Sequence, residues 1–148
     1  MKAAVVRLSN FYNYSDPNHP AFSVKNYQLD EHTLKAMALT IPYMIGYTDL
    51  ELFNNNMTDM TASVIIMAFF ANPTMNRLSI AYNHLRMTFV SAFCNLIKLF
   101  PNKILQLNVM GSIAFPDHTE PITKSLNILE SLNILNLAGC GMTHRTCR

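Results

Sequence analysis

The chain has 148 residues, of which 50% are hydrophobic and 14% are charged, and its formal net charge is +2 at pH 7. This length is typical of one domain, and the apolar content excludes an intrinsically disordered chain. The charged fraction lies well below the usual roughly 25%, which excludes a coiled coil. The small net charge argues against a nucleic-acid-binding protein, and the scarcity of charged residues indicates that a partner covers part of the surface.

The sequence also restricts the compartment. The longest unbroken apolar run, Val64 to Ala71, has eight residues, whereas a membrane-spanning helix needs roughly 20. No signal-peptide pattern is present near Met1. Cys94, Cys140 and Cys147 are not spaced as a CxxC motif. We therefore expect a cytoplasmic protein with reduced thiols and no membrane insertion.

In chain order, residues 1–18 come first, and we expect them to form an N-terminal arm or cap. A strand is predicted around residues 22–24. A helix is then predicted to begin at Asp30, which can cap it, and to end at Pro42. The apolar residues of this segment recur at the i, i+3, i+4, i+7 spacing of one helical face.

Further units of strand and helix are expected to follow. Strands are predicted around residues 50–52, 78–80, 107–109 and 132–137. The second helix is predicted to begin at Thr58 or Asp59, and the third to run from Thr88 to Phe100. Pro121 is typical of a first helical turn, so we expect the fourth helix to begin there. The predicted core face of the second helix consists of Met60, Val64, Met67 and Ala68.

Three similar segments show that the units are repeated. They read LELFNNNM at 50–57, LSIAYNHL at 78–85 and LNLAGCGM at 135–142. Windows that begin near 22 and 107 complete the series, so that the steps are 28, 28, 29 and 28 residues. The repeats therefore start near 19, 47, 75, 104 and 132, and we expect the last one to be incomplete.

When the windows are compared with the pattern L-x-x-L-x-L-x-x-N/C-x-L, 19 of the 20 residues at positions 1, 4, 6 and 11 are apolar, and the first repeat departs from the pattern at His19 and Tyr27. Positions 4 and 6 of a short strand point the same way, into the core. A polar side chain at position 9 can bond backbone groups that the following turn leaves unpaired. In the fourth repeat Leu105 and Leu107 also fit positions 4 and 6, so its phase stays open. Position 9 holds Tyr27, Asn55, Asn83, Ser112 and Cys140.

On these motifs, the chain resembles a leucine-rich repeat protein of the ribonuclease-inhibitor-like class, over residues 19–142. The resemblance implies an α/β fold, a horseshoe-shaped segment of a solenoid. It would have about five strand–helix coils, a parallel concave sheet and convex helices. The domain would span residues 19–148. An ordinary α/β domain with leucine-rich strands is the alternative, although such domains seldom keep so regular a spacing.

A concave face of this kind would be lined by the outward positions of each strand. Aromatic and large apolar residues there are candidate anchors for another protein, and acidic and basic residues on neighbouring strands can pair with each other. The candidate protein-binding residues are Asp49, Glu51, Phe53, Arg77, Tyr82, Gln106, Asn108, Met110 and Asn136.

No recognisable pattern indicates chemistry. The five histidines form no HExxH motif, and neither a glycine-rich phosphate loop nor GxSxG occurs. Asp49 and Glu51 are close in sequence but are expected on an open sheet, which offers no cleft to raise a carboxyl pKa. We therefore expect no enzyme, and assign no catalytic, cofactor-binding or metal-ligating residues and no small-molecule substrate.

The resemblance implies a noncatalytic scaffold for protein–protein interaction. We expect a structural subunit docked in a larger assembly, in the cytoplasm, a ciliary axoneme or another cytoskeletal structure. The partners would be other proteins and not nucleic acid. Since no helix or polar cap follows the last predicted strand, a neighbour is expected to cover that coil. The alternative is a regulatory module, an enzyme inhibitor or a GTPase-activating module, that acts through its concave face.

Overall fold

The computed structural model describes residues 20–144, so the expected arm of residues 1–18 and position 1 of the first repeat, His19, lie outside the described residues. Strands and helices alternate along the chain. The elements are β1 (Ala21–Lys25), α1 (Glu31–Thr40), the 3-10 helix η2 (Ile41–Tyr43), β2 (Asp49–Phe53), α2 (Asp59–Ala71), β3 (Arg77–Ser79), α3 (Met87–Leu99), β4 (Gln106–Asn108), α4 (Pro116–Leu126) and β5 (Ile134–Asn136).

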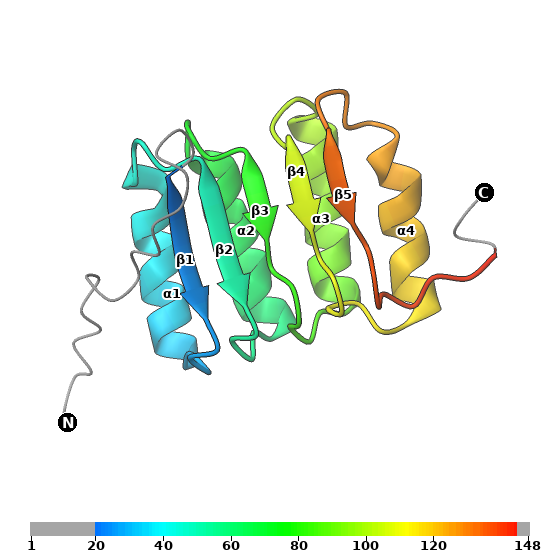
Figure 1. The fold of residues 1–148 in the computed structure, drawn as a ribbon, viewed down its shortest axis with the longest axis horizontal. Helices are drawn as coiled ribbons and strands as arrows, with labels where there is room; N and C mark the ends of the chain where they lie inside the picture. Colours follow the sequence, from blue (N-terminus) through cyan, green and yellow to red (C-terminus); the bar gives the residue numbers. More distant parts are fainter. Residues whose placement is uncertain (1–19, 145–148) are drawn as a thin grey trace.

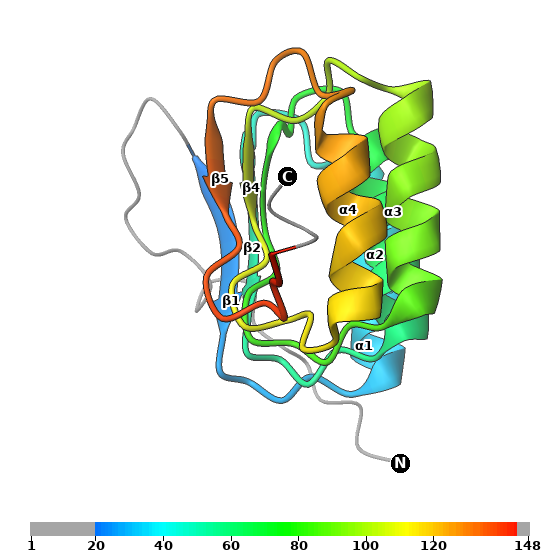
Figure 2. The ribbon, with the colours of Figure 1, turned by 90° about the vertical axis from the view of Figure 1, so that its right-hand side faces the viewer.

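The five strands form a single sheet in the order β1-β2-β3-β4-β5, and every neighbouring pair is parallel. The helices lie side by side on one face of this sheet (Figures 1 and 2). We call the other face, which carries no helix in the described part of the chain, the open face. The expected α/β class with alternating strands and helices is confirmed.

The strand register follows the repeat spacing. Leu50 pairs with Leu78, Leu78 with Leu107, and Leu107 with Leu135. Leu107 therefore occupies position 4 of its repeat, and the alternative phase that used Leu105 for that position is wrong. Residues that share a repeat position lie next to each other across the sheet, which brings side chains from distant parts of the sequence into single rows.

Positions 4 and 6 of the first four units are buried beneath the helices, as predicted. The exception lies in the last unit, where Leu135 is 42% exposed while Leu78 at the same position is 1% exposed. Residues 137–144 carry no helix that would cover Leu135. At position 11 of the fourth repeat, Ala114 is exposed and Ile113 is buried instead.

Side chains at position 9 connect each turn to the preceding one. The backbone N–H of Tyr27 donates to Oδ1 of Asn55 over 3.1 Å, and the N–H of Asn55 donates to Oδ1 of Asn83 over 3.1 Å. The N–H of Asn83 donates in turn to Oγ of Ser112 over 3.0 Å. These bonds satisfy donors that a buried turn would otherwise leave unpaired.

The same side chains donate back to the strands. Each one reaches the backbone carbonyl at position 6 of the preceding unit, with donor–acceptor distances between 2.6 and 3.2 Å. The predicted role of position 9 is therefore confirmed, and serine and cysteine take the place of asparagine in the last two units. The bonds are Asn55 Nδ2 to Val24 O, Asn83 Nδ2 to Leu52 O, Ser112 Oγ to Ile80 O and Cys140 Sγ to Val109 O.

The residue before position 9 adopts a positive φ in every unit. Asparagine and glycine take this left-handed conformation at the lowest cost, and they occupy four of the five sites. Tyr82 is the exception, with φ 56°. The turn that follows each strand thus shares one left-handed residue at the same repeat position throughout the sheet. The residues and their φ angles are Asn26 (61°), Asn54 (48°), Tyr82 (56°), Gly111 (64°) and Gly139 (66°).

The predicted core face of the second helix is wrong. Met60, Val64 and Met67 are 63%, 37% and 59% exposed. The buried side of α2 is formed by another set of residues, which includes Ile65, Ile66, Phe69 and Phe70, and of the four predicted residues only Ala68 is buried. Because α2 is apolar on all sides, the spacing of its apolar residues does not distinguish the core side from the solvent side.

The fourth helix begins earlier than predicted. Pro116 occupies its first turn, and Pro121 lies inside the helix. Both prolines are compatible with a helix start by sequence, so residue type alone does not choose between them. The first helix follows its prediction: the Asp30 carboxylate accepts a hydrogen bond from the Thr33 N–H, and Leu34 and Ala38 are buried.

Replacement of Asn83 by alanine tests the contribution of the position-9 bonds. Its side chain accepts from the N–H groups of Asn55 and Met57 and donates to three carbonyls, that of Leu52 among them. Since each buried group left unpaired costs about 1–3 kcal/mol, we expect Asn83→Ala to lower the free energy of unfolding by about 3 kcal/mol. Urea denaturation followed by circular dichroism measures the loss.

Asn95→Ala is the matched control, because Asn95 is exposed on α3. A surface change of this kind is expected to stay within about 0.5 kcal/mol. Equal losses in the two variants would contradict a special role for position 9.

Candidate protein-binding face

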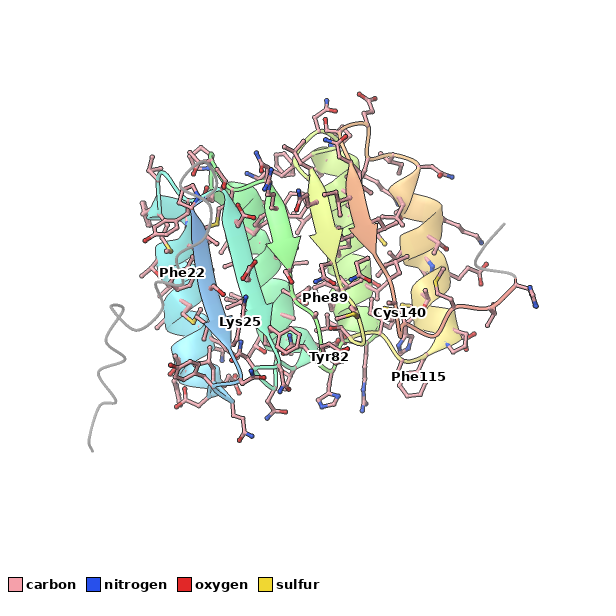
Figure 3. All side chains as sticks on the ribbon, viewed as in Figure 1. Phe22, Lys25, Tyr82, Phe89, Phe115 and Cys140 are labelled. Atoms are coloured by element: carbon pink, nitrogen blue, oxygen red, sulfur yellow. The ribbon has the colours of Figure 1, made fainter. Side chains whose placement is uncertain are left out.

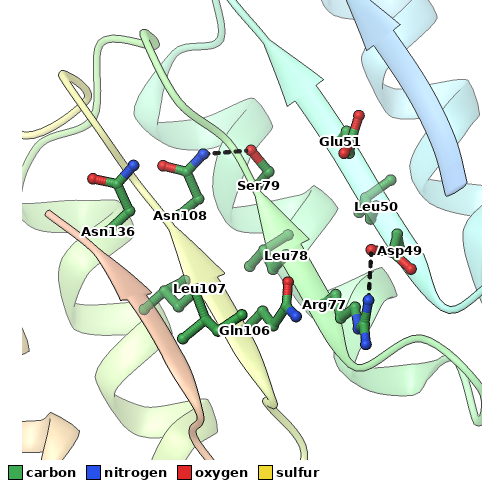
Figure 4. Close-up of a pocket in the computed structure, with 11 residues that line it drawn as sticks. Asp49, Leu50, Glu51, Arg77, Leu78, Ser79, Gln106, Leu107, Asn108 and Asn136 are labelled. Carbon is green, nitrogen blue, oxygen red and sulfur yellow. Dashed lines mark hydrogen bonds and ion pairs between the residues drawn. The ribbon is translucent and has the colours of Figure 1, made fainter. Parts of the chain in front are cut away.

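The open face contains a shallow hollow of about 220 Å³ over the middle of the sheet (Figure 4). Its lining comes from β2, β3, β4 and β5, because the parallel register places their outward residues in adjacent rows. Six of the nine residues predicted for this face line the hollow, and the other three lie near the carboxyl ends of the strands. The six are Asp49, Glu51, Arg77, Gln106, Asn108 and Asn136.

The first row of the hollow runs across the sheet from Asp49 through Arg77 to Gln106. Nη1 of Arg77 lies 3.9 Å from Oδ1 of Asp49, and both side chains are largely buried. The Thr48 hydroxyl donates to the other Asp49 oxygen over 2.5 Å. The predicted pairing of acidic and basic residues across neighbouring strands is therefore confirmed for this pair.

Glu51 is held by two residues of β1. Nζ of Lys25 lies 2.7 Å from Oε2 of Glu51, and the Ser23 hydroxyl donates to the same oxygen over 2.8 Å. Burial raises the pKa of Glu51, but the hydrogen bonds from Lys25 and Ser23 and the charge of Lys25 outweigh this effect. The pKa of Glu51 therefore lies below its ordinary value, and the group stays ionised on this face.

The second row carries uncharged amides on β4 and β5. Nδ2 of Asn108 donates to the Ser79 hydroxyl over 3.1 Å, and its Oδ1 accepts from the Met110 N–H over 3.1 Å. Asn136 accepts in the same way from the Ala138 N–H over 3.0 Å. Since an amide oxygen has a second lone pair, both groups retain acceptor capacity toward a partner. The open face is thus charged over β1 to β3 and neutral over β4 and β5.

Two aromatic rings lie at the carboxyl end of this face: Phe53 is the last residue of β2, and Tyr82 follows β3 (Figure 3). The centroids of Phe53 and Tyr82 are 5.0 Å apart at an interplanar angle of 64°, an edge-to-face contact. The Tyr82 ring lies over Gly111, where an added Cβ would be 2.8 Å from the ring. Met110 is half-buried nearby, and its sulfur accepts a weak contact from the Asn136 amide over 3.7 Å. Tyr82 remains substantially exposed, so it is the most accessible of the three predicted anchors.

Ser79 and Ile134 also line the hollow, together with three leucines at position 4 of their repeats, and neither belongs to the nine predicted residues. Both hold outward strand positions, so the repeat phase alone places them on this face. Ile134 adds exposed apolar surface beside the amides of β4 and β5. The signal that identifies both is therefore their repeat position and not their residue type.

A second hollow of about 460 Å³ lies where α3 and α4 begin. Its lining includes Asp59, whose carboxylate accepts from the N–H groups of Arg86 and Thr88 and so caps the helix of the next unit. Exposed Phe115 lies edge-on to His118, whose buried Nδ1 atom has no hydrogen-bond partner among the described residues. These residues come from separate units and match no motif, so sequence reasoning missed this site.

Two further observations concern residues 20–144. Residues 20–144 contain no group of three or more histidine, cysteine or acidic side chains arranged to hold a metal ion. None of their helices combines the length and the apolar content that crossing a lipid bilayer requires.

The chain was compared with protein-family models and with curated proteins. No protein-family model matches the chain, and no curated protein matches it significantly. Functional inference therefore depends on the geometry of the molecule itself.

The Glu51 contacts predict a pH dependence. A carboxyl group whose pKa is lowered by folding stabilises the fold above its ordinary pKa of 4.5, and this contribution is lost as the pH falls through the lowered value. We expect Glu51→Gln to be less stable than the wild type at pH 7 and to approach it as the pH falls below the ordinary pKa of the carboxyl group. Thermal unfolding between pH 3 and 7 measures the difference.

Lys25→Met is the companion variant, because it keeps an apolar stem and removes the ammonium group that lowers the Glu51 pKa. Lys25→Met should lower the free energy of unfolding at pH 7 and reduce the further loss of stability as the pH falls. An unchanged pH profile in Glu51→Gln would contradict the assigned contacts.

Gly111→Ala tests the support of the Tyr82 ring. The new methyl group would collide with the ring, whereas Gly139 has a similar φ of 66° and only ordinary contacts at 3.5 Å. Both variants bear the cost of alanine at positive φ, about 1 kcal/mol. We expect only Gly111→Ala to show an additional loss and an altered near-ultraviolet circular dichroism signal of tyrosine. Equal behaviour of the two variants would show that the ring moves away without cost.

Proposed function

We propose that the chain is a noncatalytic leucine-rich repeat protein of the ribonuclease-inhibitor-like type, whose units form a curved solenoid. The open face is then its concave face, and its role is to hold other proteins as a structural subunit of a larger assembly. The observation that carries this proposal is the ladder of position-9 side chains, which repeats from turn to turn with the sequence spacing. An ordinary α/β domain has no need of such a ladder.

The composition of the open face supports binding to protein. Paired charges, amide oxygens with a second lone pair available and a small aromatic cluster occur together over neighbouring strands. Protein interfaces typically combine aromatic anchors with a polar surround of this kind. The hollow is shallow and widely open, so it fits a protruding loop or side chain better than an enclosed small molecule.

The exposed side of β5 supports a second contact. Ile134 and Leu135 are both exposed there, and the backbone edge of a terminal strand is a ready site for further pairing. A further protein segment that covers this side would complete the burial of the last unit. Placement in the cytoplasm, a ciliary axoneme or another cytoskeletal assembly is the corresponding cellular proposal.

The exposed Tyr82 ring also favours a second candidate function. A regulatory module would use the same cluster of Phe53, Tyr82 and Met110 to hold an enzyme or a GTPase. The two functions differ in one measurable respect. A scaffold retains its partner without changing the partner's turnover, whereas a regulator changes that turnover.

The test is cross-linking and mass spectrometry of the tagged chain in native extracts, with wild type and a Phe53→Ala, Tyr82→Ala, Met110→Ala triple variant in parallel. We expect the wild type to cross-link reproducibly to a defined set of proteins through the open face. The triple variant should recover these proteins at least tenfold less, because truncation of anchor residues removes most of the binding energy.

An Asp117→Ala, Lys124→Ala variant is the control, because both residues lie on α4, away from the open face. It should behave like the wild type. Partners that are retained equally by all three proteins, or cross-links confined to other surfaces, would contradict binding through the open face.

A further inference from the structure

The helices form one layer beside the sheet (Figure 2). Exposed apolar residues of this layer are centred on α2. We call them the outer patch, which consists of Leu39, Met60, Val64, Met67, Ala71 and Leu99. Four of these residues recur along α2 at i, i+4, i+7 and i+11, which places them in one stripe on the helix. All six are exposed in the described structure.

The patch continues across three helices. The residues that precede α1, α2 and α3 as N-caps are Asp30, Thr58 and Arg86, at intervals of 28 residues. Residues 28 apart therefore occupy the same level on adjacent helices. Leu39 of α1 lies level with Met67 of α2, and Ala71 of α2 lies level with Leu99 of α3. The exposed side chains thus form one continuous surface and not isolated apolar residues.

None of the six residues of the outer patch is ionisable, and the exposed Lys98 of α3 lies next to Leu99 at its rim. The one ionisable residue of α2 is Asp59, and its carboxylate is occupied by the N–H groups at the start of α3. On α1, Lys35 is paired with Glu31 at 2.5 Å, outside the stripe. An identical patch laid against this one therefore buries no like charges over α2, and Lys98 at the rim can keep its ammonium group in water.

Its area matches the requirement of a dimer. From the exposed fractions, the six side chains present about 600 Å², the upper end for the largest patch on a typical monomer. Two such patches in mutual contact bury about 1,200 Å², the lower limit of a stable interface. The flexible side chains of Met60 and Met67 can adjust to each other across such a contact.

From these observations we propose that a second copy of this chain occupies the outer patch, so that the protein is a homodimer joined through α2. A two-fold axis near Val64, the centre of the stripe, brings the two α2 helices together and leaves both open faces accessible. The dimer thereby presents two identical binding faces that point in opposite directions. This inference does not depend on the proposed binding partner.

The first test is sedimentation equilibrium of the purified full-length chain over a wide concentration range. We expect a reversible monomer–dimer equilibrium for the wild type. Met67→Glu, which places a charge at the patch, should weaken dimerisation at least tenfold. Because Met67 is exposed and glutamate favours helix, the variant should keep the circular dichroism spectrum and thermal stability of the monomer.

Asn136→Glu is the control, since it adds the same charge on the opposite side of the sheet. It should leave the dimer intact. A wild type that stays monomeric at all concentrations, or a dimer that Asn136→Glu disrupts and Met67→Glu does not, would overturn the proposal. The second result would indicate association through the open face.

The second test is a disulfide at the predicted axis. Val64→Cys, in a chain whose Cys147 is replaced by serine, should oxidise readily to a covalent dimer, because Cys94 and Cys140 are buried and free. Lys124→Cys in the same background is the reference, because α4 lies beyond α3 from the patch. Equal rates of cross-linking for the two variants would overturn the proposed interface.

Discussion

Hydrogen bonds between successive turns are the constraint on which the rest of the molecule depends. Each strand ends in a tight turn with a left-handed residue, and such a turn has N–H and carbonyl groups that it cannot pair by itself. The side chain at position 9 supplies both partners: Asn83 accepts from the turn before it and donates to the strand before it. The parallel register, the helix layer and the open face all follow from this repeated alignment.

Much of the fold could be predicted from the sequence, because the residues that make these hydrogen bonds recur at a regular spacing. The leucines at position 4 and the polar residues at position 9 obey one spacing, and the register confirms it in every strand. The periodicity of apolar residues gave wrong predictions where residue type does not distinguish one side or one start of a helix from another. In α2 both sides are apolar, so the core side depends on packing against α1 and α3, and the start of α4 depends on which of two prolines meets the preceding turn.

The candidate site was predictable to the same extent. Repeat phase placed Asp49, Arg77 and Gln106 on one face, and the structure brings their side chains into one row. Ser23 lies opposite Glu51 at the repeat spacing. The sequence did not reveal that the ion pair of Glu51 is with Lys25 of β1, because this choice of partner depends on side-chain rotamers. The hollow at the start of α4 was equally inaccessible, since its residues come from three units that share no motif.

The side chains of Asp59 and Asn83 connect neighbouring units in opposite directions. Asp59 caps the helix of the following unit, whereas Asn83 satisfies the backbone of the preceding one. The position-9 bond recurs at the same place in successive units, so a unit removed or inserted as a whole leaves that exchange intact. The Asp59 cap, in contrast, lies at the junction of α2 and α3. A change of a few residues within a unit breaks several of these hydrogen bonds at once. During evolution such a chain can lengthen or shorten in steps of about 28 residues, and the same rule applies to engineered versions.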